Sequence, residues 1–393
     1  MLKNRIMLKR ILSTIVVFAA CIAVNAQGTC LINGTIDKDC LCDGKKIKTV
    51  TLTRTDELGR EIEVATAKVK KNRYIFKYEL AKDEPVLMYT IKGLGGEKDV
   101  EVFVEPGEVA VSTFSNAASI VTGTPTNDLY LEYIANRNDD SLLDFCKEKL
   151  VRLHGSEWLE SAEGKEAINK IAREKIKTKA YLMRLLIDNN ASPMTPLMIG
   201  RWLPILTPAY AEQMLNTVST TLHSHPYYHS LRNRVLANNM KVGNEVPDIS
   251  LHLANGDKKQ LSDYRGKYVV LNFWASDCGK SADMFAELHA LCDVIKENNG
   301  QFVIISVALD SDCAQWRKAI TANKADREVW LHACDGCGMA SPAAKLFGVE
   351  KTPRIVVVEP EGRAVSLDMD IDELVMRAEQ ILSGDLYYLD DVK

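Results

Sequence analysis

Cys278 is the residue of this chain best placed for covalent chemistry. An apolar run, Tyr268 to Phe273, leads to it, and a helical pattern begins directly after it. The positive end of a helix dipole stabilises a thiolate, which is the nucleophilic form of cysteine. Ser281 stands three positions later, where a dithiol site would carry a second cysteine. The segment therefore predicts thiol chemistry at one sulfur.

Cys334 and Cys337 form a second candidate redox pair, because they have the C-x-x-C spacing. This spacing is typical of a redox pair or of half a zinc site. Zinc needs two further ligands, and His332 is the only one close in sequence, so we predict no metal here. Three interpretations stay open: a loop disulfide, idle thiols, or a pair that replaces the missing partner of Cys278.

The first 26 residues have the pattern of an export signal. Four cations precede an apolar stretch, Ile11 to Val24, which is too short to span a bilayer comfortably. Val24-Asn25-Ala26 then forms a small-residue cleavage pattern. An uncleaved anchor and lipidation at Cys21 are the alternatives. We expect a protein of the periplasm or cell envelope, either soluble or attached to the membrane through Cys21.

Size and composition indicate a globular protein of several domains. A chain of 393 residues is too long for one small core, and 46% hydrophobic with 26% charged residues is ordinary. The formal net charge is −4, and without the four leader cations 45 basic residues face 53 acidic ones, a net charge of −8. This acidity argues against a nucleic-acid partner.

The cysteine count bears on the chemistry of an exported chain. Nine cysteines remain after the predicted leader, in a compartment where disulfides persist. An odd number leaves at least one thiol outside the intrachain disulfides, and Cys278 is our candidate. Cys30, Cys40 and Cys42 lie close together without a fourth ligand, so we expect a disulfide or free thiols there rather than a metal.

Histidines also cluster, at positions 223, 225 and 229. Pro226 directly follows the second of them, which indicates a loop that enters a helix rather than a metal site. We therefore predict neither a metal nor a cofactor for this protein.

Periodicity divides the chain at about residues 122 and 241. Residues 27–122 are predicted to be β-rich, a sandwich or open barrel, because short alternating runs recur between turn residues. These runs are 48–53, 61–65, 74–78, 86–90 and 100–104. Residues 123–241 are predicted to be helical, with apolar residues at helical spacing and prolines that divide the helices. One such apolar face contains Ile168, Ile171, Ala172 and Ile176.

Residues 242–393 begin with a linker, 242–248, and then alternate between strands and helices. The predicted strands are 268–273, 302–309, 354–359 and 364–367, and the predicted helices are 279–296, 313–323, 341–347 and 371–382. Alternation that ends in a hairpin indicates a compact α/β domain with a mixed sheet.

This C-terminal part resembles the thioredoxin-like fold of the TlpA and ResA type, within the AhpC/TSA redoxin group. The matching residues are Val246-Pro247-Asp248, Asn255-Gly256, Leu261-Ser262-Asp263-Tyr264-Arg265-Gly266-Lys267, Leu271-Asn272-Phe273-Trp274-Ala275-Ser276 and Thr352-Pro353. The β-rich part resembles a domain of unknown function found ahead of such redoxins in Gram-negative envelope proteins. It matches in Val104-Glu105-Pro106-Gly107 and Gly123-Thr124-Pro125-Thr126-Asn127.

The resemblance implies a mechanism in which a first cysteine, matched by Cys278, attacks a substrate disulfide. A second cysteine then resolves the mixed disulfide. Ser281 occupies that position, so its hydroxyl can donate a hydrogen bond to the thiolate but cannot form a disulfide. An external thiol reductant or a distant cysteine would have to release the adduct. Pro353 matches a proline that is cis in this fold and packs beside the reactive cysteine.

The chain departs from the family pattern around this cysteine. Asp277 replaces a tryptophan and disfavours the thiolate, whereas Lys280 replaces a proline and favours it. Met284 and Ala286 stand where the family has an acidic residue, thought to assist proton transfer, and a proline.

Three functions compete. The first is an exported monothiol thiol-disulfide oxidoreductase that acts on disulfides of envelope proteins and serves cell redox homeostasis. The second is a redox-inactive binding or scaffold protein of the envelope, since fold does not guarantee activity. The third, a peroxidase of the AhpC/TSA type, is disfavoured because Ala275 stands where a threonine would help to position peroxide.

Overall fold

The computed structural model describes residues 28–42, 44–95, 99–115, 118–137, 140–297, 301–325 and 327–382. The predicted export signal and Cys21 lie outside these residues. Two compact units are formed, one mainly of Ala65–Asp128 and the strands up to Thr51, the other of Leu52–Val64 and the chain from Leu129 onward. None of the helices in the described ranges combines the length and apolar character needed to cross a membrane.

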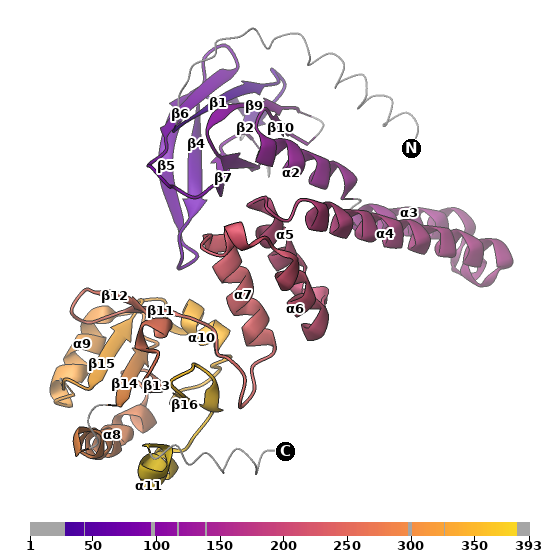
Figure 1. The fold of residues 1–393 in the computed structure, drawn as a ribbon. Coiled ribbons are helices and arrows are strands. Elements are labelled where there is room, and N and C mark those ends of the chain that lie inside the picture. Colours follow the sequence, from indigo (N-terminus) through magenta and orange to yellow (C-terminus); the bar gives the residue numbers. More distant parts are fainter. Residues whose placement is uncertain are drawn as a thin grey trace. The chain divides into compact units, whose positions relative to one another are not determined.

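The N-terminal part is β-rich, as predicted (Figure 1). Its strands are β1 (Thr29–Ile36), β2 (Leu41–Cys42), β3 (Lys45–Lys46), β4 (Thr49–Thr55), β5 (Glu61–Lys68), β6 (Arg73–Glu79), β7 (Leu87–Lys92), β8 (Val100–Val104), β9 (Gly107–Thr113) and β10 (Ile120–Thr122). They form two four-stranded sheets, in the orders β10-β9-β1-β6 and β5-β4-β7-β8, and a small hairpin of β2 and β3.

Strand β1 was missed by the sequence analysis, whose first predicted strand begins at residue 48. Gly34 weakens the strand pattern, but it pairs with Tyr74 of β6, and a side chain at this position would overlap the tyrosine ring. The aromatic ring thus fills the space that the glycine leaves. Cys30 is fully buried on the same strand, and neither it nor Cys40 nor Cys42 forms a disulfide.

Two segments of the β-rich part that match its family pattern meet at a buried polar cluster. The Glu105 carboxylate accepts hydrogen bonds from the backbone amide and the hydroxyl of Thr126, both at 2.8 Å. The Asn127 side chain pairs with the backbone amide and carbonyl of Phe103, also at 2.8 Å. These bonds join the end of β8 to the first turn of α2 (Pro125–Asn136). Because all of these groups are buried and paired, the motif has a structural role.

The middle of the chain is helical, as predicted. It contains α3 (Asp140–His154), α4 (Ala162–Asp188), α5 (Met194–Trp202), α6 (Pro208–Thr217) and α7 (Pro226–Asn238), with short 3-10 turns between them. His225 caps α7, since its Nδ1 accepts the backbone N–H of Tyr227 at 3.2 Å. No group of three or more His, Cys, Asp or Glu side chains in the described residues could hold a metal ion.

The predicted apolar face of α4 is only partly correct. Its buried side chains are in the last turns, at Leu182, Met183, Leu185 and Leu186. Ile176 is 67% exposed, although its spacing placed it on the buried face. The periodicity predicted the helix correctly. It did not predict which turns of α4 are buried, because burial depends on the elements that pack against the helix.

The C-terminal part contains one mixed sheet in the order β15-β14-β13-β16-β17, which confirms the predicted fold. Its strands are β13 (Tyr268–Trp274), β14 (Phe302–Ala308), β15 (Trp330–Cys334), β16 (Arg354–Val358) and β17 (Ala364–Ser366). The first three are parallel, whereas β16 and β17 are antiparallel to their neighbours. Strand β15 was missed by the sequence analysis because the polar His332 interrupts its apolar run.

Helices and a hairpin cover the two faces of this sheet. Alternate residues of β13 point into two separate cores, with Val270 and Trp274 in one and Val269 and Leu271 in the other. The first core contains residues of α8 (Gly279–Glu297), α9 (Cys313–Ala322) and α11 (Ile371–Leu382). The second contains residues of α10 (Pro342–Leu346) and Leu251 of β11 (Ser250–His252), which forms a hairpin with β12 (Lys258–Gln260).

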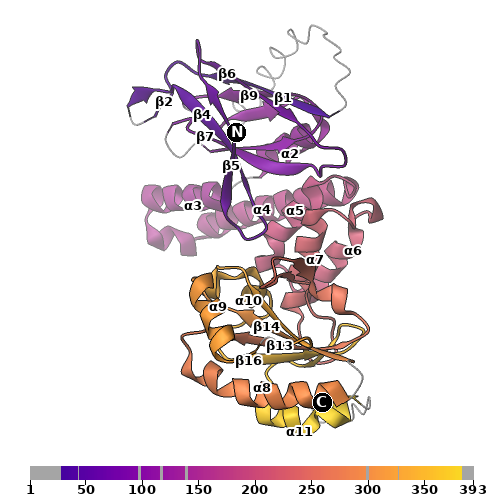
Figure 2. The same ribbon diagram turned by 90° about the vertical axis from the view of Figure 1, so that its left-hand side faces the viewer.

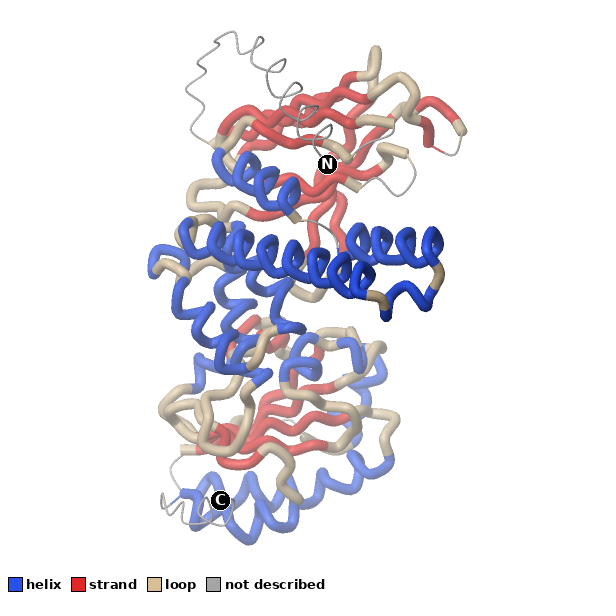
Figure 3. The backbone as a smooth tube through the Cα atoms, turned by 90° about the vertical axis from the view of Figure 1, so that its right-hand side faces the viewer, coloured by secondary structure: helices blue, strands red, loops and turns tan. Residues whose placement is uncertain are grey.

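Helices α8 and α11 pack side by side on the first face (Figure 1, Figure 2), and Figure 3 shows the molecule from the side opposite to that of Figure 2.

The segment before the sheet is held by a motif that matches the redoxin pattern. The Asp248 carboxylate accepts the backbone N–H of Ser262 at 2.9 Å and its hydroxyl at 2.7 Å. Asn233 of α7 bonds both backbone groups of Asp248.

Candidate active site

Cys278 lies at the carboxyl edge of the sheet, between β13 and α8. Strand β13 is buried along its whole length, so the chain emerges at the surface only after Trp274. The backbone then makes a tight turn: the Cys278 N–H donates to the Ala275 carbonyl at 3.1 Å, and the Ser281 N–H donates to the Cys278 carbonyl at 3.0 Å. Helix α8 starts at Gly279, so the partly exposed thiol directly precedes it, as predicted.

The loop before β16 brings Pro353 to this site. The Thr352–Pro353 peptide bond is cis, which confirms the expectation for this proline. The Cys278 thiol donates to the Thr352 carbonyl oxygen at 3.6 Å. This contact joins residues 74 positions apart. It exists because β16 pairs with β13, with Arg354 opposite Phe273, so the two loops leave the sheet together.

Ser281 is buried, with 1% of its surface exposed. Its hydroxyl has no hydrogen-bond partner among the described residues, so the expected bond to the Cys278 sulfur is not formed. A buried hydroxyl without a partner is uncommon and costs stability. Ser281 thus stands three positions after Cys278 without a hydrogen bond to its sulfur.

Asp310 is a residue of the site that the sequence analysis missed. It is 8% exposed and follows β14, the neighbour of β13. Its carboxylate accepts the Ser276 backbone N–H at 3.1 and 3.2 Å and the Ser276 hydroxyl. These bonds hold the turn two residues before Cys278. The only signal in the sequence was a carboxylate directly after a buried apolar strand.

The altered neighbours of Cys278 have different environments. Met284 is 6% exposed and packs in the first core with Trp274 and Phe285. An apolar side chain at this position cannot transfer a proton. Asp277 is exposed to solvent.

Cys334 and Cys337 lie elsewhere on the same edge of the sheet. The register places Trp274, Ala308 and Cys334 side by side on β13, β14 and β15, so Cys334 is two strands from the nucleophile's strand, roughly 10 Å away. The Cys334 sulfur lies 3.5 Å from that of Cys313. The Cys337 sulfur instead contacts the carbonyl of Asp335 at 3.7 Å. None of the nine cysteines in the described residues is in a disulfide, and a Cys334–Cys337 redox pair stays a prediction.

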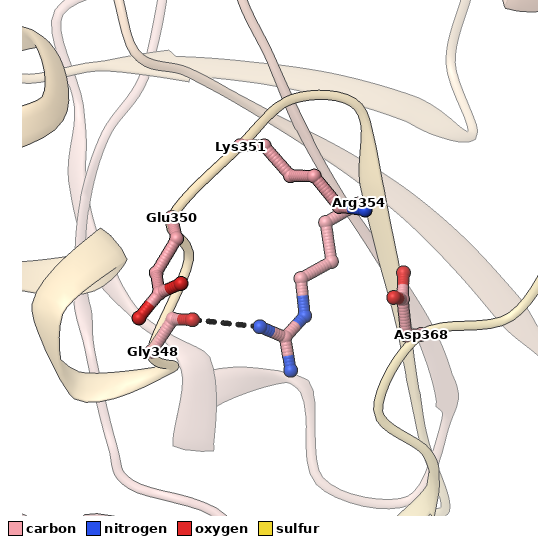
Figure 4. Close-up of a pocket in the computed structure, with 5 residues that line it drawn as sticks. All are labelled: Gly348, Glu350, Lys351, Arg354 and Asp368. Carbon is pink, nitrogen blue, oxygen red and sulfur yellow. Dashed lines mark hydrogen bonds between the residues drawn. The ribbon is translucent and has the colours of Figure 1, made fainter.

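A cavity of about 370 Å³ lies beside the loop that carries Pro353 (Figure 4). It is lined by Gly348, Glu350, Lys351, Arg354 and Asp368. The Arg354 guanidinium donates to the carbonyls of Gly348 at 2.7 Å and Leu367 at 2.8 Å. These hydrogen bonds connect the loop before β16 to the segment after β17. The lining contains no thiol, so this cavity is separate from the candidate site at Cys278.

Comparison with protein families finds matches to two segments of the chain. Residues 242–363 match the AhpC/TSA family, and residues 30–130 match a domain of unknown function, DUF4369. The C-terminal part is thus an AhpC/TSA redoxin domain with a thioredoxin-like fold, and the β-rich part is a DUF4369 domain. Both resemblances noted from the sequence are confirmed.

Individual relatives each match only part of the chain. The chain is 35% identical over 72 residues to the thioredoxin-like protein YneN of Bacillus subtilis, which covers 18% of this chain and 41% of that protein. It is 24% identical over 126 residues to the thiol-disulfide oxidoreductase ResA of Bacillus thuringiensis, which covers 32% and 68%. A solved thiol-disulfide oxidoreductase from Bacteroides fragilis is 28% identical, with a TM-score of 0.33, over 35% of this chain and 99% of that one. The chain therefore spans less than half the length of the first of these relatives.

Proposed function

We propose that this protein is an exported thiol-disulfide oxidoreductase of the monothiol type, which acts through Cys278 on disulfides of cell-envelope proteins. The observation that carries the proposal is a partly exposed thiol directly before α8, in contact with the carbonyl of Thr352. Similarity of the redoxin domain to ResA supports the reaction class. Export and the choice of envelope substrates rest on the sequence pattern of residues 1–26.

The reaction begins with a Cys278 thiolate. It attacks one sulfur of a substrate disulfide, so that a Cys278–substrate disulfide forms and the other substrate sulfur leaves as a thiolate. Ser281 has no sulfur with which to break this adduct. A second thiol must therefore attack it. An external thiol reductant gives net reduction, whereas a thiol of the same substrate gives a rearranged disulfide and no net redox change.

A second candidate function, a redox-inactive binding protein of the envelope, is favoured by two features of the site. Ser281 replaces the resolving sulfur, and Met284, which is buried in the core, replaces the acidic residue. Both changes remove steps of turnover but leave the fold intact, and fold alone does not establish activity.

The test compares the chain from Gln27 with its Cys278→Ala variant. Each is incubated with a protein that contains a disulfide, and adducts are detected by mass spectrometry without reduction. We expect a mixed disulfide on Cys278 in the parent and thiol-dependent disulfide reduction that the variant loses. Cys146→Ser, which alters a partly exposed cysteine of α3, is the matched control and should behave as the parent. Equal reduction by parent and Cys278→Ala, with no adduct, would favour the binding protein.

A further inference from the structure

Cys313 and Cys334 form a thiol pair that is separate from the Cys278 site. Their sulfurs are 3.5 Å apart although the residues are 21 positions apart in the chain. Cys334 ends β15, and Cys313 begins α9, which follows the neighbouring strand β14. The sheet register therefore brings the two sulfurs together. Closing this gap to a disulfide bond requires the two sulfurs to approach each other by about 1.5 Å.

The surroundings of the pair leave room for the Cys313 sulfur. Gly336 has a φ of +72°, and a side-chain carbon there would lie 3.3 Å from this sulfur. The loop of the C-x-x-C motif thus passes over Cys313 at a residue without a side chain. Cys334 is 7% exposed, and its thiol donates to the Asp310 carbonyl at 3.7 Å. Cys313 is partly exposed and is therefore the more accessible residue of the pair.

The protonation of Cys334 fits the role of a second attacker. Burial raises the pKa of its thiol well above the ordinary value, and the adjacent Cys313 sulfur adds to this rise. A hydrogen bond from the Gly336 backbone amide acts in the opposite direction, because it stabilises the thiolate. The raised pKa disfavours the Cys334 thiolate, so the more accessible Cys313 is the first of the two sulfurs to react.

We propose that Cys313 and Cys334 form a second redox centre, a disulfide that small disulfides make and small thiols break in the folded protein. The pairing differs from the C-x-x-C pairing of Cys334 with Cys337. The centre does not depend on the activity proposed for Cys278.

The chemistry needs a disulfide as oxidant, for example oxidised glutathione. The Cys313 thiolate attacks it, forms a mixed disulfide and releases one glutathione thiol. The Cys334 sulfur then gives up its proton and attacks the Cys313 sulfur, which forms the Cys313–Cys334 bond and releases the second thiol. The two cysteines lose two electrons and two protons in total, and both pass to the glutathione disulfide. Reduced glutathione reverses both steps.

The experiment uses the chain from Gln27 with Cys278→Ser, so that its outcome is independent of the proposed activity. The folded protein is equilibrated with oxidised and reduced glutathione at graded ratios, quenched with acid, alkylated and mapped by mass spectrometry. We expect a Cys313–Cys334 cross-linked peptide and parallel loss of alkylation at both residues. Reduced glutathione should restore alkylation without denaturant, while circular dichroism stays unchanged.

Two further variants identify the partner. Cys337→Ser should keep the cross-link, whereas Cys313→Ser should abolish it and leave Cys334 open to alkylation after quenching. The proposal is wrong if the cross-link joins Cys334 to Cys337, or if Cys313 and Cys334 remain alkylated under oxidising conditions. It is equally wrong if the bond forms only after unfolding, or if thiols cannot reduce it in the folded state. Mapping of Cys337→Ser decides the question even if Cys313→Ser does not fold.

Discussion

Ser281 is the residue at which this site departs most from a dithiol enzyme. Its hydroxyl is buried and has no partner among the described residues, so no hydrogen bond is lost when it is replaced. The position is also the one that a resolving cysteine occupies in the C-x-x-C spacing. A sulfur at this position should therefore restore the missing step at little cost in stability.

We predict that Ser281→Cys releases the adduct that accumulates on Cys278. The new thiol would attack the mixed disulfide, so a disulfide between Cys278 and the introduced sulfur should appear, and thiol-dependent turnover should rise. Intact mass and an insulin-type reduction assay would detect this. Ser281→Ala is the control: it should keep the adduct, and its free energy of unfolding should be unchanged or higher by about 1 kcal/mol. An adduct that persists equally in Ser281→Cys would contradict the prediction.

Cys292 shows how burial separates inert from reactive sulfurs. It is fully buried in α8, and burial raises the pKa of its thiol to about 11. At pH 8 only about one molecule in a thousand would carry the thiolate. We predict that iodoacetamide modifies Cys292 in the folded protein more than about a hundredfold more slowly than an accessible cysteine. The rate should rise as the pH approaches 11.

Native-state alkylation at several pH values, read by mass spectrometry, checks the prediction for Cys292. The partly exposed Cys146 is the internal reference. Similar rates at Cys292 and Cys146 at pH 8 would mean that the core of the redoxin domain opens readily.

At the scale of elements, the turn between β13 and α8 is held from the neighbouring strand. Asp310 extends from the end of β14 and accepts both hydrogen-bonding groups of Ser276. A buried carboxylate with these donors fixes the backbone that presents Cys278. The same residue accepts the Cys334 thiol at its backbone carbonyl, so it contacts both cysteine sites.

We predict that Asp310→Ala lowers the free energy of unfolding by roughly 3 kcal/mol, because charge-assisted hydrogen bonds are lost and their donors stay buried. Adduct formation on Cys278 should also slow. Ser276→Ala loses only the hydroxyl bond, and its smaller effect, about 1–2 kcal/mol, is the matched comparison. Urea denaturation and adduct kinetics measure the two effects. Equal free energies of unfolding for Asp310→Ala and the parent would contradict the claim that Asp310 stabilises the turn before Cys278.

At the scale of the whole molecule, the hydrogen bonds described for the candidate site join residues of the redoxin domain. Ala275, Ser276, Asp310 and Thr352 all belong to residues 242–363, the segment that matches the AhpC/TSA family. Helix α7 stabilises the start of this segment through Asn233 and Asp248.

We therefore predict that a chain of residues 194–393, which keeps α5 to α7, forms the Cys278 adduct at the same rate as the chain from Gln27. Stopped reactions followed by mass spectrometry provide the rates, and circular dichroism confirms that the shorter chain is folded. The same Cys278→Ala substitution in both chains is the control. A marked loss of rate in the shorter chain would assign a direct role in the reaction to the N-terminal part.

Much of this arrangement follows from local sequence. The buried run before Cys278 and the helical pattern after it predicted β13 and α8, and the helix at 371–382 was predicted with its observed bounds. These elements depend on periodicity and on the residues at their ends. The fold and the place of Cys278 before a helix therefore follow from the sequence alone.

Other features depended on strand order, which no local pattern contains. The pairing of β16 with β13 brings Thr352 to Cys278. The pairing of β15 with β14 brings Cys334 to Cys313, although Cys337 is the cysteine nearer to Cys334 in the sequence. Asp310 had no motif to mark it, because its partners come from another loop. The sequence by itself determined which residues can do chemistry and which elements carry them. The tertiary structure alone decided which sulfurs and carboxylates meet, since contacts between distant residues arise only when the strands assemble.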